Sequence, residues 1–407
     1  MLQKPDATWS LPAQREAILE ALKLESDMLV LMKTGSGKSM IPIILSILED
    51  FITVLILPLR SLMADYIRKL KDMHVPFEQY KGSQITEYLH GRHNLILVSA
   101  DMARTKHWEQ CIGVLHDKRP VVRFVFDEGH YAFTADDFRE SLRDLHELRF
   151  FAVQLVVLTG TCPLIAELLV VKAFGLRNHK VFRTDTNRPE LKFILETPHN
   201  DTIKHIKWLI TSHESAMNPE DRWLLFVTSI GDGKLMERNL GYQFYHGDLD
   251  DTTQLQLVTA WHNGTKRGMI CTSAFGAGND YAHVRYIYHL GTPFEGIGYI
   301  QEVSRAGRDG QVAVCYIFPT GGSGYNRTSV GDVQGRAMIS KLVCQPSQQH
   351  PGACLRYQLT QFCDGVGTHC LHQNTNQLCS ACSILKQTPT LPAPFKSKQN
   401  ILYFSVQ

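Results

Sequence analysis

The chain has 407 residues, of which 44% are hydrophobic and 20% charged, a composition typical of a globular protein with two or three domains. Its formal net charge of +2 excludes a strong overall attraction to nucleic acid, so such binding would have to come from a local groove. No apolar run approaches the roughly 20 residues of a membrane span and the start lacks a signal-peptide pattern, so we expect an intracellular protein without a membrane partner.

A helical pattern upstream of residue 28 contains Gln14. A glutamine side chain offers both a donor and an acceptor, which suits the edge of an adenine ring when a nucleotide site follows. Taken alone, Gln14 is a weak signal, because an isolated glutamine is more commonly an ordinary surface residue.

Residues 29–40 have the order strand, glycine-spaced turn and helix that is typical of a phosphate-binding loop. The backbone N–H groups of such a turn point at a polyphosphate, and the helix N-terminus adds partial positive charge. Lys38 would place a cation on the β- and γ-phosphates, and Ser39 a hydroxyl on Mg²⁺. Met32 stands where the general pattern begins with glycine, which leaves a simple Gly/Ser turn as the alternative. The predicted nucleotide-binding residues of this loop are Thr34, Gly35, Ser36, Gly37, Lys38 and Ser39.

Continuous apolar runs after this loop predict a parallel sheet covered by helices on both faces. The runs lie at 53–57, 95–98, 123–126 and 155–158. The third run leads into Asp127 and Glu128, where one carboxylate could hold Mg²⁺ and the other could orient a water molecule. A solvated acidic turn is the alternative. The fourth run ends in Thr159-Gly160-Thr161, a hydroxyl-rich turn that could link the Mg²⁺ site to a neighbouring domain.

A polar, proline-containing segment at 183–189 indicates a domain boundary, after which a second α/β pattern begins. Its strands are predicted at 224–227, 244–246, 269–271, 286–290 and 313–318, and its helices near 232–240, 250–263 and 295–303. Arg305 and Arg308 follow the last helix and share one helical face. Facing a triphosphate, they could neutralise charge on the γ-phosphoryl group, although such a pair is often only a solvated face.

Cysteines concentrate in the last part of the chain, where a Cys-x-x-Cys pair at 379–382 has further cysteines upstream. In a chain without a signal peptide, this clustering favours tetrahedral Zn²⁺ over disulfides. Cys354, Cys370, Cys379 and Cys382 are the preferred ligands, and Cys363 is expected to pack within a helix. The remaining segment at 386–407 is proline-rich and is expected to be extended or disordered.

Taken in order, these motifs resemble a superfamily-two helicase and, within that superfamily, the RecQ family of DNA helicases. The strongest links are Ala-Phe-Gly-Ala-Gly at 274–278, Arg-Ala-Gly-Arg-Asp-Gly at 305–310 and the cysteine cluster. The resemblance covers 9–383 and implies an α/β fold of two RecA-like parallel-sheet domains followed by a zinc module. The expected boundaries are 1–187 and 188–340 for the two RecA-like domains, 341–385 for the module and 386–407 for the tail.

The resemblance implies an ATP-dependent 3′–5′ DNA helicase or translocase that acts on single-stranded or partly duplex DNA, with a role in recombination and repair. It would use ATP, Mg²⁺ and Zn²⁺, and it would be located in the nucleus of a eukaryote or the cytoplasm of a bacterium. The catalytic residues that it implies are Lys38, Asp127, Glu128, Arg305 and Arg308. Further nucleotide contacts are implied for Gln14 and Asp280, and DNA contacts for Arg60, Ser61 and Thr272. The implied metal ligands are Ser39 and Asp127 for Mg²⁺, and Cys354, Cys370, Cys379 and Cys382 for Zn²⁺.

Departures from the family pattern define a second hypothesis. The loop after His130 lacks the tryptophan thought to couple DNA to hydrolysis, and Ser304 replaces a glycine. Gly129, which replaces an alanine, is a milder change. Only residues 383–407 follow Cys382, too few for the winged-helix domain that the family uses on duplex ends. The chain could therefore be a nucleic-acid-binding relic or scaffold with weak or uncoupled ATPase activity. An RNA-directed helicase of the same superfamily is a third hypothesis.

Overall fold

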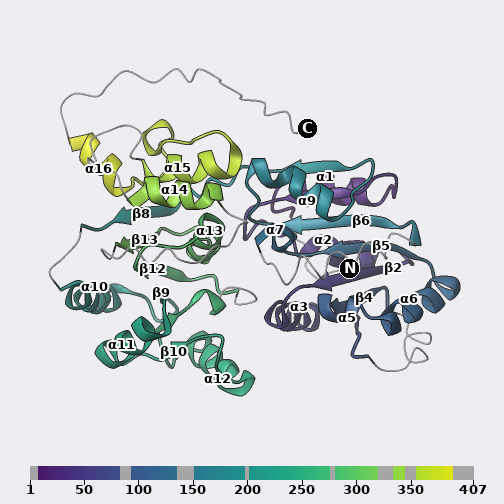
Figure 1. Cartoon of the computed structure of the whole chain (residues 1–407), viewed down its shortest axis with the longest axis horizontal. Helices are drawn as coiled ribbons and strands as arrows, with labels where there is room; N and C mark the ends of the chain where they lie inside the picture. Colours follow the sequence, from purple (N-terminus) through teal and green to yellow (C-terminus); the bar gives the residue numbers. More distant parts are fainter. Residues whose placement is uncertain are drawn as a thin grey trace.

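The computed structural model describes residues 8–82, 93–134, 151–197, 201–275, 280–319, 333–343 and 354–387. Two domains, each built on a parallel sheet, stand side by side, and a small helical module lies against the second domain (Figure 1). Within these ranges, no helix combines the length and apolar character that crossing a membrane requires. The tail predicted at 386–407 falls outside the described residues from 388 onward.

The first domain is a seven-stranded, all-parallel sheet in the order β3-β4-β2-β5-β6-β1-β7. Its strands are β1 Met28–Leu31, β2 Ile52–Leu57, β3 Glu78–Gln79, β4 Leu95–Ser99, β5 Val121–Phe126, β6 Gln154–Thr159 and β7 Lys180–Arg183. Its helices are α1 Pro12–Ala21, α2 Met40–Leu48, α3 Arg60–Asp72, α5 Ala100–Ala103, α6 Lys106–Lys118, α7 Tyr131–Thr134, η2 Leu164–Ala166 and α9 Glu167–Ala173.

The continuous apolar strands of this sheet supply two cores, because alternate side chains point to opposite faces. In β2, Val54 and Ile56 enter the core on one face, whereas Leu55 and Leu57 enter the core on the other. All four side chains are buried, as expected for a sheet covered on both sides. This arrangement brings the carboxyl ends of all the strands to one edge, where ligands of such sheets bind.

The second domain is a six-stranded, all-parallel sheet in the order β10-β11-β9-β12-β13-β8. Its strands are β8 Leu191–Leu195, β9 Arg222–Val227, β10 Phe244–Tyr245, β11 Gly268–Cys271, β12 Val284–Leu290 and β13 Ala313–Phe318. Its helices are α10 Thr202–Ala216, α11 Ile230–Leu240, α12 Asp251–His262, η3 Ser273–Phe275 and α13 Gly296–Val303. The predicted fold of two parallel-sheet domains is therefore confirmed. The strands β3, β7 and β8 were not predicted.

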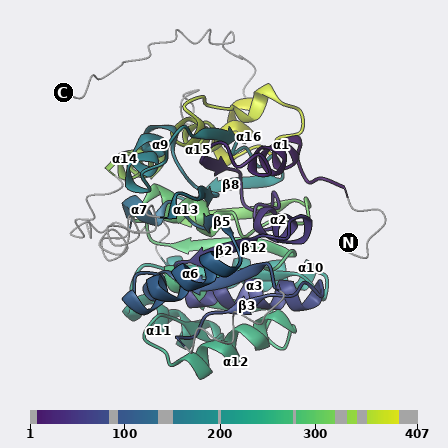
Figure 2. The same cartoon turned by 90° about the vertical axis from the view of Figure 1, so that its right-hand side faces the viewer.

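The cysteine-containing module consists of α14 Val333–Val343, α15 Leu355–Asp364, η6 Cys370–His372 and α16 Ser380–Gln387. Apolar side chains of α15, among them Leu355 and Leu359, belong to the same core as Leu191 and Phe193 of β8. Gly365, at the end of α15, lies against Leu164 of η2 in the first domain. Figure 2 shows α15 and α16 at the same end of the molecule as α1 and α9, so the module touches both domains.

Candidate nucleotide-binding site between the domains

The turn between β1 and α2 has the backbone conformation of a phosphate-binding loop. Gly35 and Gly37 have φ angles of 83° and 82°, a left-handed region that glycine adopts without the strain of a Cβ atom. Such a turn directs successive N–H groups into its concave side and leads into the N-terminus of α2. Both glycines line a pocket between the two domains.

Lys38 reaches back across this loop. Its Nζ donates to the carbonyl oxygens of Met32 at 2.6 Å and Lys33 at 3.2 Å, and the side chain lines the pocket. Burial lowers the pKa of Lys38, while the charges of Glu128 and Asp127 oppose that change. Gly160 lies close to these side chains: a Cβ atom at this position would lie 3.0 Å from Lys38 Nζ and 3.1 Å from Thr34 Oγ1.

Gln14 of α1 makes a hydrogen bond to the phosphate-binding loop. Its Nε2 donates to the carbonyl oxygen of Gly37 at 2.8 Å, and its Oε1 accepts from the backbone N–H of Ser10 at 3.0 Å. The side chain is buried and does not belong to the pocket lining. What the structure shows is a contact that holds the loop to α1. The role of Gln14 in reading adenine stays a prediction.

Asp127 and Glu128 follow β5 at the floor of the pocket. Asp127 Oδ1 accepts from the N–H of Glu128 at 2.8 Å, and Oδ2 accepts from the hydroxyl of Tyr66 at 2.7 Å. Burial and the charge of Glu128 raise the pKa of Asp127 to about 6. Burial alone would raise the pKa of Glu128, but the hydrogen bond from His130 and the charges of His130 and Lys38 bring it below its ordinary value. Glu128 has φ 53°, an uncommon angle outside glycine that aims its side chain into the pocket.

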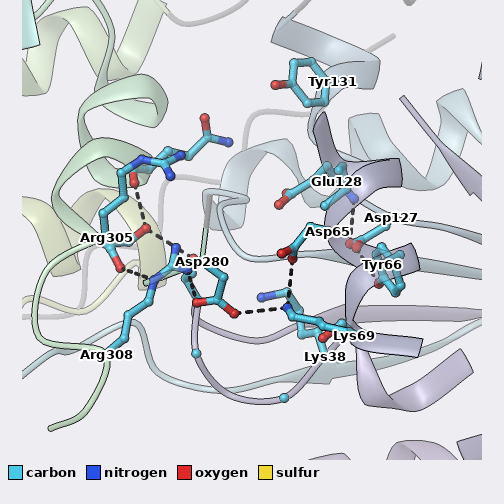
Figure 3. Close-up of a pocket in the computed structure, with 17 residues that line it drawn as sticks. Lys38, Asp65, Tyr66, Lys69, Asp127, Glu128, Tyr131, Asp280, Arg305 and Arg308 are labelled. Atoms are coloured by element: carbon cyan, nitrogen blue, oxygen red, sulfur yellow. Dashed lines mark hydrogen bonds and ion pairs between the residues drawn. The ribbon is translucent and has the colours of Figure 1, made fainter. Parts of the chain in front are cut away.

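The second domain presents Arg305, Arg308 and Asp280 to this pocket from the opposite side (Figure 3). Arg308 Nη1 donates to Asp280 Oδ1 at 2.5 Å, and Lys69 of α3 contacts Asp280 Oδ2 at 3.0 Å and Asp65 Oδ2 at 3.0 Å. Burial would raise the pKa of Asp280, but the charges of Arg308 and Lys69 hold it below its ordinary range. Arg305 is buried, and this burial together with the charge of Arg308 lowers its pKa to about 10.

Two further contacts join the domains beside the pocket. Gln301 Nε2 lies 2.6 Å from His130 Nε2 and donates to Thr161 Oγ1 at 3.1 Å. Ser304 Oγ lies 3.3 Å from Thr34 Oγ1 of the phosphate-binding loop. The serine that departs from the family's glycine therefore makes a contact between the domains in this structure.

The residues predicted to contact DNA lie outside the pocket. Arg60 and Ser61 begin α3 and are exposed, and Arg60 Nη1 approaches Asp251 Oδ2 of the second domain at 3.6 Å. Thr272 follows β11, where its N–H donates to Tyr245 O at 3.1 Å. All three residues follow the carboxyl ends of β2 or β11, but their contact with DNA stays a prediction.

Four cysteine side chains of the module meet at one point. The Sγ atoms of Cys354, Cys370, Cys379 and Cys382 all lie within 4.8 Å of one another, and all four residues are buried. Four thiolates around one Zn²⁺ at about 2.3 Å would be separated by about 3.8 Å, so the cluster fits this ion. Cys363, in α15, is buried outside the cluster. Cys344 lies outside the described residues.

Sequence reasoning missed one wall of the pocket. Asp65, Tyr66 and Lys69 of α3 line it, as does Tyr131 at the start of α7. The spacing of the three α3 residues puts them on one helical face directly after a predicted strand, which is the signal that could have indicated them. The tryptophan-free loop after His130 continues from α7 into 135–150, which lies outside the described residues.

Two family models match the chain, one in each of the two parallel-sheet domains. The DEAD/DEAH box helicase model matches residues 11–168, and the helicase conserved C-terminal domain matches residues 202–310. The chain therefore has the two-domain core of a superfamily-two helicase.

Within this class the sequence is RecQ-like. It is 28% identical over 333 residues to the RecQ-like DNA helicase BLM of Xenopus laevis, a match that covers 75% of this chain and 24% of that protein. It is 30% identical over 326 residues to the ATP-dependent DNA helicase Q-like 4B of Arabidopsis thaliana, covering 75% of this chain and 28% of that one. Identity to the ATP-dependent DNA helicase RecQ of Synechocystis sp. is 27%, over 75% of this chain and 67% of that one. The chain thus spans about a quarter of the first two relatives.

Solved structures share the fold at low sequence identity. The helicase Lhr of Mycobacterium smegmatis, bound to ssDNA and AMP-PNP, superposes with a TM-score of 0.60 at 16% identity, over 82% of this chain and 48% of that one. Dbp5 of S. cerevisiae, bound to RNA and ADP BeF3, gives 0.61 at 15% identity, over 81% and 91%. Proteins of this fold therefore include partners of both DNA and RNA.

Proposed function

We propose that this chain is an ATP-dependent DNA helicase or translocase that moves 3′ to 5′ on single-stranded DNA. One observation carries the proposal: a single pocket between the domains is lined by Lys38, Asp127 and Glu128 on one side and by Arg305 and Arg308 on the other. The names of the RecQ-like relatives, which are DNA helicases, support DNA over RNA. The 3′ to 5′ direction is what the resemblance to the RecQ family implies.

The residues of the pocket divide the chemistry of phosphoryl transfer between them. Lys38 and the N–H groups of its loop would hold the β- and γ-phosphates of ATP, and Glu128 would orient the attacking water. Asp127 and Ser39 are the side chains that would hold Mg²⁺, which supplies positive charge to the phosphates when bound. Arg305 and Arg308 would neutralise charge that develops on the γ-phosphoryl group, acting from the second domain.

This division makes turnover depend on how the domains meet. Gln301 contacts His130 and Thr161, so residues beside Glu128 are tied to the second domain. ATP would favour the closed arrangement, and hydrolysis would release it, which changes the grip on a strand lying across both domains. Binding to the strand would be mostly to phosphates, and therefore salt-dependent and weakly sequence-specific.

Steady-state ATP hydrolysis with and without single-stranded DNA tests this proposal. We expect DNA to stimulate turnover in the wild-type chain and Lys38→Ala to abolish it, because the lysine is the principal cation of the loop. A control with single-stranded RNA of the same length distinguishes the two substrates. Equal turnover in Lys38→Ala and wild type would refute the site assignment.

Two other functions predict different results in the same assay. Stimulation by RNA but not DNA would favour the RNA-directed helicase, whose fold is represented by Dbp5. Binding of DNA or ATP without stimulated turnover would favour a relic or scaffold. The charged side chains that line the pocket from both domains, Lys38, Asp127, Glu128, Arg305 and Arg308, favour a working ATPase over that alternative.

A further inference from the structure

The linker between the domains, residues 184–190 between β7 and β8, is held in place by a buried arginine of the cysteine module. Arg356 of α15 is 1% exposed, and its guanidinium donates to oxygens of the linker and of Gln377 rather than to a carboxylate. Nη1 donates to Asn187 Oδ1 at 2.8 Å and to the carbonyl oxygen of Arg188 at 2.6 Å, while Nη2 donates to the carbonyl oxygen of Leu191. Its hydrogen-bond partners in the described part of the chain are uncharged oxygens. Burying a cation in this way is costly unless several such bonds compensate, which indicates a defined position for both partners.

Asn187 connects this arginine to the phosphate-binding loop. Lys33, which precedes the loop residue Thr34, donates from Nζ to the carbonyl oxygen of Asn187 at 2.9 Å. On its other side, Asn187 Nδ2 donates to Asn376 Oδ1 of the module at 3.0 Å. Asn187 is itself buried, so one linker residue contacts the first domain and the module together.

Arg188 connects the same linker to the arginine motif of the second domain. Its Nη1 and Nη2 donate to the carbonyl oxygens of Ser304 at 3.3 Å and Ala306 at 2.7 Å, on either side of Arg305. Arg308 Nε shares the carbonyl oxygen of Ser304 at 3.3 Å. The backbone that carries both candidate catalytic arginines is thereby attached to the linker.

We propose that Arg356, Asn187 and Arg188 form a linker clamp through which the cysteine module positions Arg305 and Arg308 against the phosphate-binding loop. All three are positioning residues, since none of them lines the nucleotide pocket. The proposal rests on the proposed ATPase function. Without the clamp, the first domain would still bind ATP, but Arg305 and Arg308 would reach the nucleotide in the productive geometry less often. Small misplacements of catalytic groups lower the rate strongly.

Replacing Arg356 with methionine tests the clamp, because it removes every donor and keeps much of the side-chain length. We expect kcat for ATP to fall at least ~10-fold while the affinity for ATP, measured by direct binding, changes less than ~3-fold. Arg267→Met is the matched control. Arg267 also donates to backbone carbonyl oxygens, those of Glu214 and Met217, but it precedes β11, which lies near the opposite edge of the sheet from β8. We expect its kcat to stay within ~2-fold of wild type.

A double variant separates a shared mechanism from general damage. If Arg188 and Arg356 act through one linker, Arg188→Met/Arg356→Met should turn over about as fast as the slower single variant, not at the product of the two losses. Multiplicative losses, or a wild-type kcat in Arg356→Met, would overturn the clamp. Should Arg356→Met fail to fold, Arg188→Met, which leaves the module intact, decides on the same kcat criterion. A wild-type chain without ATPase activity would instead refute the proposed function itself.

Discussion

Asp280 forms ion pairs with one cation from each domain. It pairs with Arg308 within its own domain and with Lys69 across the pocket. We expect Asp280→Asn to lower ATP turnover about 10-fold or more, because Arg308 loses the carboxylate that aims it. Lys69→Met should cost less, about 2–5-fold, since that pair is partly exposed and screened by solvent.

Steady-state kinetics of the two variants at low and moderate salt measure this difference. Added salt should reduce the effect of Lys69→Met, because screening already weakens the wild-type pair. Arg308→Ala is the reference for complete loss of the arginine, with an expected loss of about 10³-fold. If Lys69→Met were as slow as Arg308→Ala, Lys69 would have to act on the nucleotide directly rather than through Asp280.

Gly129, next to Asp127 and Glu128, stands where the structure leaves no room for a side chain. A Cβ atom at this position would lie 2.3 Å from Cγ1 of Val157, a fully buried residue of β6. We expect Gly129→Ala to destabilise the first domain by about 1–3 kcal/mol through overpacking. Thermal unfolding measures the loss, and Gly129→Ala/Val157→Ala should lose less stability than the sum of the single variants. Additive losses would locate the strain elsewhere.

Among the elements, we expect the cysteine module to depend most on a bound ion. Its four buried thiols surround one point, and we expect one Zn²⁺ per chain by metal analysis. Cys379→Ser should lose that zinc and lower the melting temperature, because metal binding and folding of such a module are coupled. Cys363→Ser is the matched control: this cysteine is equally buried in α15 but outside the cluster, so zinc should be retained. Full zinc content in Cys379→Ser would exclude Cys379 as a ligand.

The elements that the sequence predicted well are those whose residues share one environment. Central strands such as β2 and β6 are mostly apolar because both of their faces are buried, and their predicted positions were correct within two residues. Edge strands carry weaker signals. The strand β3 has only the polar residues Glu78 and Gln79, and β7 is partly exposed along its length, so neither shows the apolar run on which the prediction depended.

The residues of the candidate site also fall into those that local sequence predicts and those that it does not. The residues from Thr34 to Ser39 and the pair Asp127 and Glu128 could be proposed from local motifs, because in each case the backbone turn and the candidate catalytic side chain lie in one short stretch. The bonds that Tyr66 and Lys69 make to Asp127 and Asp280 depend on how distant segments meet. No periodicity within a single segment specifies such contacts.

At the scale of the whole molecule, the domains also approach each other beyond the nucleotide pocket. Arg60 of the first domain lies 3.6 Å from Asp251 of the second, and their side chains are 93% and 88% exposed. An ion pair this exposed contributes little to holding the domains together. Its position at the start of α3 instead makes Arg60 available to a phosphate, in competition with Asp251.

Binding of single-stranded DNA at several salt concentrations separates these two roles. If Arg60 contacts a phosphate, Arg60→Ala should weaken binding and reduce the slope of log K against log salt by about 0.7, the value for one phosphate contact on a single strand. Asp251→Ala should strengthen binding, because it frees the arginine and removes a negative charge from the path of the strand. A pair that only held the domains together would make both variants change affinity in the same direction. The opposite signs of the two effects would therefore show that a strand lies across both domains at this point.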